Sequence, residues 1–158
     1  LVEAARAEGL TAYALVLPYM TAHRVQNGNY RFLRVADWID AHTPPGATVG
    51  VFNSGAIGYF SARHVVNLDG KVNPEALAAL RQDALRDYVR RERIDYVIDH
   101  EWILRQFLLP GRADDGVRLA RVVDDSALGV PGWSAYRVER LPVANAAGSS
   151  SVVSRLHP

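Results

Sequence analysis

Residues 49–73 read VGVFNSGAIGYFSARHVVNLDGKVN, and this stretch decides the fold that we predict. It holds two short apolar runs, Val49–Phe52 and His64–Leu68, and each run ends in small or polar residues. Short β-branched runs that stop at Gly and Asn are typical of buried strands. Ala56–Ser61, between the two runs, favours one or two turns of helix. The stretch therefore predicts a strand, a short crossover helix and a second strand.

The chain around this unit alternates helical and strand patterns. Apolar residues recur at helical spacing over Tyr30–His42, and a second helix starts at the capping residue Asn73 and runs to about Arg91. The remaining predicted elements are the strand Ile94–Ile98, the helix His100–Leu109 capped by Asp99, and the strands Val117–Val123 and Ser134–Arg140. This order predicts an α/β fold, namely a three-layer, Rossmann-like, mostly parallel sheet with an antiparallel C-terminal edge hairpin.

The domain boundaries follow from composition. Residues 1–29 form an N-terminal apolar and linker segment, in which Leu10–Met20 carries no charged side chain. Leu10–Met20 is about half the length that a membrane helix needs, so it reads either as a buried core segment or as the end of a membrane helix. Residues 30–141 form the α/β domain. Residues 142–158 are small, polar and aperiodic, which is typical of a tail.

Charge and cysteine content exclude several classes of function. The formal net charge is only +1, and nucleic-acid binders usually concentrate basic charge on one face, so we expect no nucleic-acid partner. The chain has no cysteine, which rules out disulfides, cysteine-based zinc sites and thiol catalysis.

The loop Asn53–Gly58 lies where a Rossmann domain keeps its phosphate-binding turn. Only Gly55 and Gly58 match the three-glycine fingerprint, so binding of a nucleotide or of S-adenosylmethionine is an alternative function rather than the leading one. Ser54 lacks the flanking glycines of a nucleophile elbow. We therefore interpret Ser54 as a helix N-cap.

Two further loops carry polar side chains suited to binding. Asp69 and Lys71 flank Gly70, and together with nearby asparagines they could bind a sugar or another polyol, or form a salt-bridged turn. The segment Asp99–Trp102 places a histidine between two carboxylates, as in an acid–base pair or part of a metal site. No second histidine follows at helical spacing, so we expect no metal there. The indole of Trp102 could stack on a sugar or be buried.

The middle of the chain, roughly Arg34–Glu101, also resembles a known family. The motifs that carry this likeness are GAIGYF (Gly55–Phe60), VNLDG (Val66–Gly70) and DYVID (Asp95–Asp99). They resemble the extracytoplasmic C-terminal domain of bacterial polytopic membrane glycosyltransferases of the GT-C type, which use polyprenyl-phosphate sugars. In that family the catalytic acid lies on a loop between membrane helices, which would precede Leu1.

The resemblance implies an accessory domain that faces the periplasm or the cell wall and is not catalytic alone. Its expected partners are the membrane part of the same polypeptide and a glycan or polyprenyl-phosphate sugar, at the cell membrane. We expect no cofactor, no metal and no catalytic residue within the chain. The other open functions are a soluble nucleotide- or S-adenosylmethionine-binding enzyme domain and a structural or assembly module. The candidate substrate-binding residues are Asn53, Ser54, Asp69, Lys71, His100, Glu101 and Trp102.

Overall fold

A computed structural model describes residues 28–111, 115–123 and 125–142. Leu10–Met20 and most of the predicted tail lie outside these residues. The elements, in chain order, are α2 (Gly28–His42), β1 (Thr48–Val51), α3 (Ser54–Phe60), β2 (His64–Asn67), α4 (Pro74–Arg81), α5 (Leu85–Arg91), β3 (Tyr96–His100), α6 (Glu101–Phe107), β4 (Val117–Val123), α7 (Asp125–Leu128) and β5 (Trp133–Arg140).

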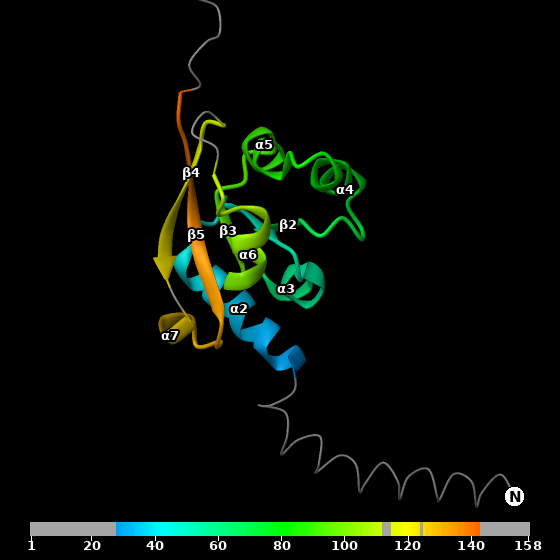
Figure 1. The fold of residues 1–158 in the computed structure, drawn as a ribbon. Coiled ribbons are helices and arrows are strands. Elements are labelled where there is room, and N and C mark those ends of the chain that lie inside the picture. The colour runs from blue at the N-terminus through cyan, green and yellow to red at the C-terminus, as the bar shows by residue number, and fades with distance from the viewer. Residues whose placement is uncertain (1–27, 112–114, 124, 143–158) are drawn as a thin grey trace, which may run out of the picture.

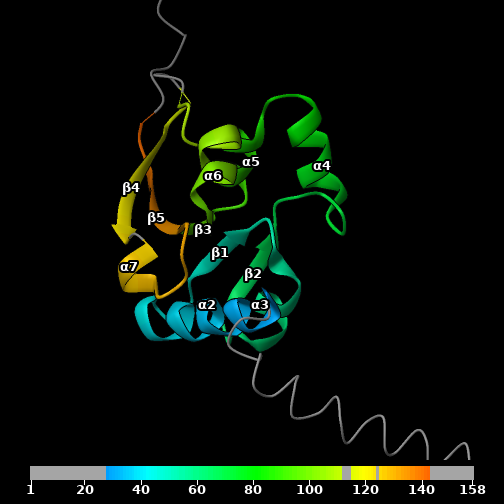
Figure 2. The same ribbon diagram turned by 60° about the horizontal axis from the view of Figure 1, so that its bottom comes forward.

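The five strands form one mixed sheet in the order β2-β1-β3-β5-β4 (Figure 2). β1 pairs in parallel with β2 and with β3, whereas β5 is antiparallel to both β3 and β4. The prediction of a mostly parallel, Rossmann-like sheet is therefore wrong, because half of the strand pairs are antiparallel.

Burial explains why β5, rather than β4, borders β3. The first four residues of β5, Trp133–Tyr136, are all buried, whereas β4 is mostly exposed or half-buried. A strand that buries side chains on both faces gains most in the interior of a sheet. The last strand in sequence therefore lies inside the sheet, and β4 takes the edge.

Helices cover both faces of the sheet, which gives the domain three layers. Figure 2 shows α2, α3 and α7 on one face and α4, α5 and α6 on the other. Ile39 of α2, Ile57 of α3 and Leu128 of α7 pack in one hydrophobic cluster. A second cluster on the opposite face contains Leu85 and Leu104. None of the helices in the described part of the chain has the length and apolar composition to cross a bilayer.

The helix predicted from Asn73 to about Arg91 is broken into α4 and α5. Asn73 does cap α4, since its side chain accepts a hydrogen bond from the backbone N–H of Ala76 at 3.2 Å. The break falls at Asp83, whose φ of 53° is left-handed. Asp tolerates this conformation better than most residues. The break lets α5 turn its own apolar side chains, among them Tyr88 and Val89, into the core.

Two other local predictions also differ from the structure. Asp99 was expected to cap the helix after β3, but it lies within β3 and His100 precedes the first turn of α6. The short helix α7, between β4 and β5, was not predicted. The first difference is a shift in an element boundary, and the second is a helix of a single turn, which local spacing hardly indicates.

Candidate functional site

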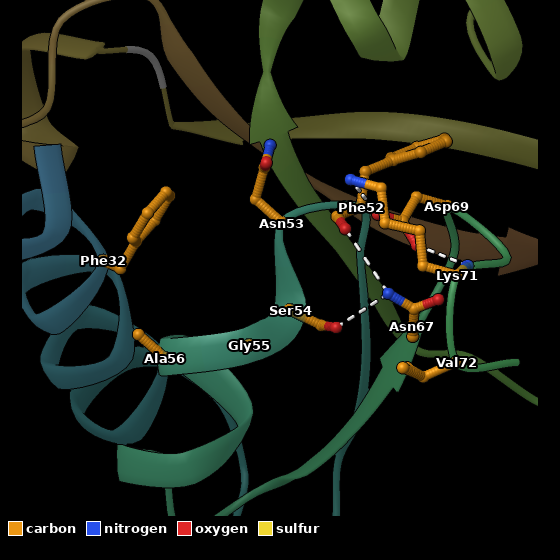
Figure 3. A pocket seen from close by; sticks show the side chains of 10 residues that line it. All are labelled: Phe32, Phe52, Asn53, Ser54, Gly55, Ala56, Asn67, Asp69, Lys71 and Val72. Atoms are coloured by element: carbon orange, nitrogen blue, oxygen red, sulfur yellow. Dashed lines mark hydrogen bonds and ion pairs between the residues drawn. The ribbon is translucent and has the colours of Figure 1, made fainter.

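A hollow of about 320 Å³ opens between the carboxyl ends of β1 and β2 (Figure 3). Carboxyl ends of parallel strands are where open α/β sheets usually bind ligands. Phe32 of α2, Phe52 and Val72 supply apolar walls. The polar residues that line the hollow are Asn53, Ser54, Asn67, Asp69 and Lys71.

Asn67 organises the polar side of the hollow. Its amide nitrogen donates to the Ser54 hydroxyl oxygen at 2.8 Å (Figure 3). Its amide oxygen accepts from the backbone N–H of Gly70 at 3.1 Å. The Ser54 hydroxyl therefore accepts from Asn67 and makes no capping bond, so its prediction as a helix N-cap is wrong. Its own proton remains available to a ligand, since a hydroxyl both donates and accepts.

Asp69 and Lys71 form the outer rim of the hollow. The Lys71 ammonium lies 3.2 Å from the Asp69 carboxylate, and the Lys71 side chain is 82% exposed. The backbone N–H of Lys71 also donates to Asp69 at 2.9 Å. Burial raises the pKa of Asp69, but these hydrogen bonds and the lysine charge outweigh burial and leave the pKa below its ordinary value. The rim therefore carries an ionised carboxylate and a cation that compensate each other.

The gap between β1 and β3, next to the hollow, is filled by the Asp99 carboxylate. This side chain is fully buried. It accepts hydrogen bonds from the backbone N–H groups of Phe52 and Asn53, both at 2.9 Å, and from the Asn53 amide at 2.8 Å. Burial raises the pKa of Asp99, and the hydrogen bonds from Asn53 and His100 oppose that rise. Asp99 thus ties the β1–α3 turn to β3.

His100 lies beside a tryptophan on the neighbouring strand. The indole N–H of Trp133 donates to Nε2 of His100 at 3.0 Å, and the two rings lie 4.7 Å apart. Burial lowers the pKa of His100, and it outweighs the raising effect of Asp99. The imidazole is therefore neutral at pH 7, with Nε2 as acceptor.

Glu101 belongs to a polar cluster over β4 and β5. Its carboxylate accepts from the Tyr136 hydroxyl at 3.0 Å and lies 2.7 Å from the Arg121 guanidinium. Burial raises the pKa of Glu101. This effect is outweighed by the hydrogen bonds from Ser134 and Tyr136 and by the charges of Arg121 and Arg105, so the pKa lies below its ordinary value. Glu101 is thus ionised and fully partnered, which makes it a poor general base.

The structure brings together only part of the predicted site. Asn53, Ser54, Asp69 and Lys71 line the hollow, whereas none of His100, Glu101 and Trp102 is among the described residues that do so. The Trp102 side chain is 63% exposed. Sequence reasoning missed the apolar walls of the hollow. Phe32 belongs to α2, far in sequence from the ends of β1 and β2, and only the tertiary fold places it beside the hollow. In the described part of the chain, no three His, Asp or Glu side chains are grouped to hold a metal ion.

Comparison with known proteins gave one match. A family model described as "Domain of unknown function (DUF8728)" matches residues 18–150. No curated protein and no solved structure matches the chain. The matched range spans most of the chain and includes every described strand, so the hollow and its rim lie inside the matched region.

Proposed function

The chain belongs to the DUF8728 family, and we propose that its α/β domain is an accessory, non-catalytic domain of a membrane glycosyltransferase-like protein. In this proposal the domain faces the periplasm or the cell wall and binds a sugar in the hollow between β1 and β2. The sugar belongs to a glycan acceptor or to a lipid-linked donor. Catalysis then takes place elsewhere in the same polypeptide.

The composition of the hollow carries this proposal. A sugar presents hydroxyl groups at its rim and carbon-bound hydrogens on its faces, so it needs both polar and apolar partners. The hollow offers the Ser54 hydroxyl and the Asp69 carboxylate beside the apolar walls of Phe32 and Val72. The likeness of Gly55–Phe60 and its neighbours to GT-C glycosyltransferase domains gives independent support.

The local charge favours a neutral ligand over a phosphate. Lys71 is the cation on the rim of the hollow, and Asp69 already pairs with it. The backbone N–H groups of Phe52 and Asn53 already donate to Asp99 and are therefore not available to a phosphate. The nucleotide- or S-adenosylmethionine-binding alternative therefore has less support than sugar binding.

Titration of the ¹⁵N-labelled chain with neutral methyl glycosides tests the proposal. We expect roughly millimolar, saturable binding, which is common for small polar ligands in open sites. The amide shifts should change at Ser54, Asn67 and Asp69. Asp69→Asn should abolish these changes, whereas Asp87→Asn, a matched substitution on the exposed side of α5, should leave them intact.

The same titration distinguishes the alternatives. Shifts at Gly55 and Gly58 with S-adenosylmethionine or ATP, and none with sugars, would replace the proposal with the nucleotide alternative. No saturable shift with any of these compounds would favour a structural or assembly module.

A further inference from the structure

We propose that the carboxyl edge of the sheet is a membrane-contact surface that lies on the lipid headgroups. The surface is formed by exposed apolar side chains from four separate segments: Tyr30, Val72, Trp102 and Val122. This inference deepens the proposed function, on which it rests, because it states which end of the domain faces the bilayer.

The topology places these four side chains at one end of the molecule. Val72 follows β2, Trp102 lies in the first turn of α6 directly after β3, and Val122 is near the end of β4. β4 runs in the same direction as β3, because both are antiparallel to β5. All three segments therefore meet at the carboxyl edge.

The start of α2 lies at this same edge. Phe32, in the first turns of α2, contacts the ring of Trp133, which pairs with His100 at the end of β3. Figure 1 shows the beginning of α2 at the end of the molecule where β5 starts and α7 lies. Tyr30 and the exposed Arg31 are therefore part of the surface.

The sequence that enters at this edge indicates what covers the surface. Leu10–Met20 is uncharged, and Met20 precedes Gly28 by eight residues (28 − 20). Eight residues span at most about 28 Å when fully extended. If Leu10–Met20 lies in a bilayer, the carboxyl edge must therefore stay close to that bilayer.

The residue types fit an interface between lipid and water. Val72 is 79% exposed and Trp102 63% exposed, so both could enter the headgroup region without unfolding the domain. Tryptophan and tyrosine are enriched at membrane interfaces, and an exposed basic residue such as Arg31 is attracted to anionic lipids. The hollow opens on the same edge, where the sugar of a lipid-linked donor would be found.

Single-cysteine labelling tests the inference directly, because the chain contains no cysteine of its own. The full 158-residue chain would carry an environment-sensitive fluorophore at Val72→Cys or Trp102→Cys. Leu141→Cys, at the opposite edge, and Tyr59→Cys, at the far end of α3, are exposed controls. Vesicles would contain equal parts of phosphatidylglycerol and phosphatidylethanolamine, with a quencher on the lipid.

We expect quenching at Val72 and Trp102 and none at the two controls. Trp102→Ser should weaken vesicle binding about tenfold, as loss of a buried aromatic side chain would, and Leu141→Ser should not. Equal quenching at all four positions, stronger quenching at Tyr59 or Leu141, or no vesicle binding would overturn the inference. The glycoside titration needs no lipid, so failure of the sugar site and failure of the membrane contact are seen separately.

Discussion

The two gaps at the carboxyl edge on either side of β1 are filled differently. Between β1 and β3 the buried Asp99 carboxylate accepts hydrogen bonds from the turn that follows β1. Between β1 and β2 the side chains of Ser54 and Asn67 bond to each other around an open hollow. The closed gap uses its polar groups to hold the fold, and the open gap keeps hydrogen-bonding capacity for a ligand.

This contrast shows that the segment richest in polar candidates after β3 is not the one that lines the hollow. The segment Asp99–Glu101 places three titratable groups in a row, yet its two carboxylates have internal partners. The polar side chains of the open gap include uncharged ones, Asn53, Ser54 and Asn67, which are not titratable groups. The four predictions below test the contrast, from the largest expected effect to the smallest.

Removal of the Asp99 side chain should have the largest effect. Asp99→Ala leaves the buried N–H of Phe52 and the partly buried N–H of Asn53 without an acceptor, which should cost about 3–5 kcal/mol of unfolding free energy. Denaturant unfolding measures this loss. Asp99→Asn keeps one acceptor and should lose clearly less. A loss below about 1 kcal/mol for the alanine variant would mean that the closed gap does not hold the fold.

Gly70→Ala should distort the turn at Gly70, which forms part of the open gap between β1 and β2. Gly70 has a φ of +77°, and an added Cβ would come within 2.7 Å of Leu77. The variant should lose about 2–4 kcal/mol, from the left-handed conformation and the clash together, and it should bind glycosides weakly. Gly46→Ala is the control, because its added Cβ would meet nothing within 4 Å. Equal stability of the two variants would contradict the described turn.

The Glu101 cluster should contribute stability that depends on pH. The pKa of Glu101 is lower in the folded chain than its ordinary value of 4.5, so its contribution is present above pH 4.5 and is lost as the pH falls through the folded pKa. Glu101→Gln should therefore be about 1 kcal/mol less stable at pH 7.

Thermal unfolding of both proteins between pH 7 and pH 3 measures this dependence. The difference between wild type and Glu101→Gln should shrink towards the acidic end. A difference that stays constant, or grows, would show that the carboxylate is not stabilised by Arg121 and Tyr136.

Asp69→Asn should change stability least. Its partner Lys71 is 82% exposed, and exposed ion pairs contribute little, so the change in unfolding free energy should stay within about 0.5 kcal/mol. The same variant should lose glycoside binding. A large loss of stability with unchanged binding would assign Asp69 to the fold rather than to the hollow.

Local patterns predicted most of the elements but not their arrangement. The apolar runs at Val49–Phe52 and His64–Leu68 became β1 and β2, and Asn73 caps α4 as its spacing indicated. The mixed sheet was missed because strand order depends on how much each strand buries. Chain order alone does not show that Trp133–Tyr136 is buried on both faces.

The candidate site residues fall into two groups in the structure for a related reason. Asn53, Ser54, Asp69 and Lys71 follow neighbouring parallel strands, so topology brings them together. His100 ends β3 and Glu101 follows it, but β3 borders the antiparallel β5, and their side chains bond to Trp133 and Tyr136 instead. The hollow lies between β1 and β2, whereas β3 lies on the other side of β1, so strand order explains why these residues do not join the hollow.

The interior position of β5 also bears on biosynthesis. Chains are made from the N-terminus, at about 5–20 residues per second, and domains generally fold as units. Until Trp133–Arg140 has emerged, β3 has an open edge and β4 has no strand to pair with. The nascent domain must therefore remain incomplete until almost all of its described residues have been translated, and the unpaired edge of β3 is exposed to chaperones and to wrong strand partners during that time.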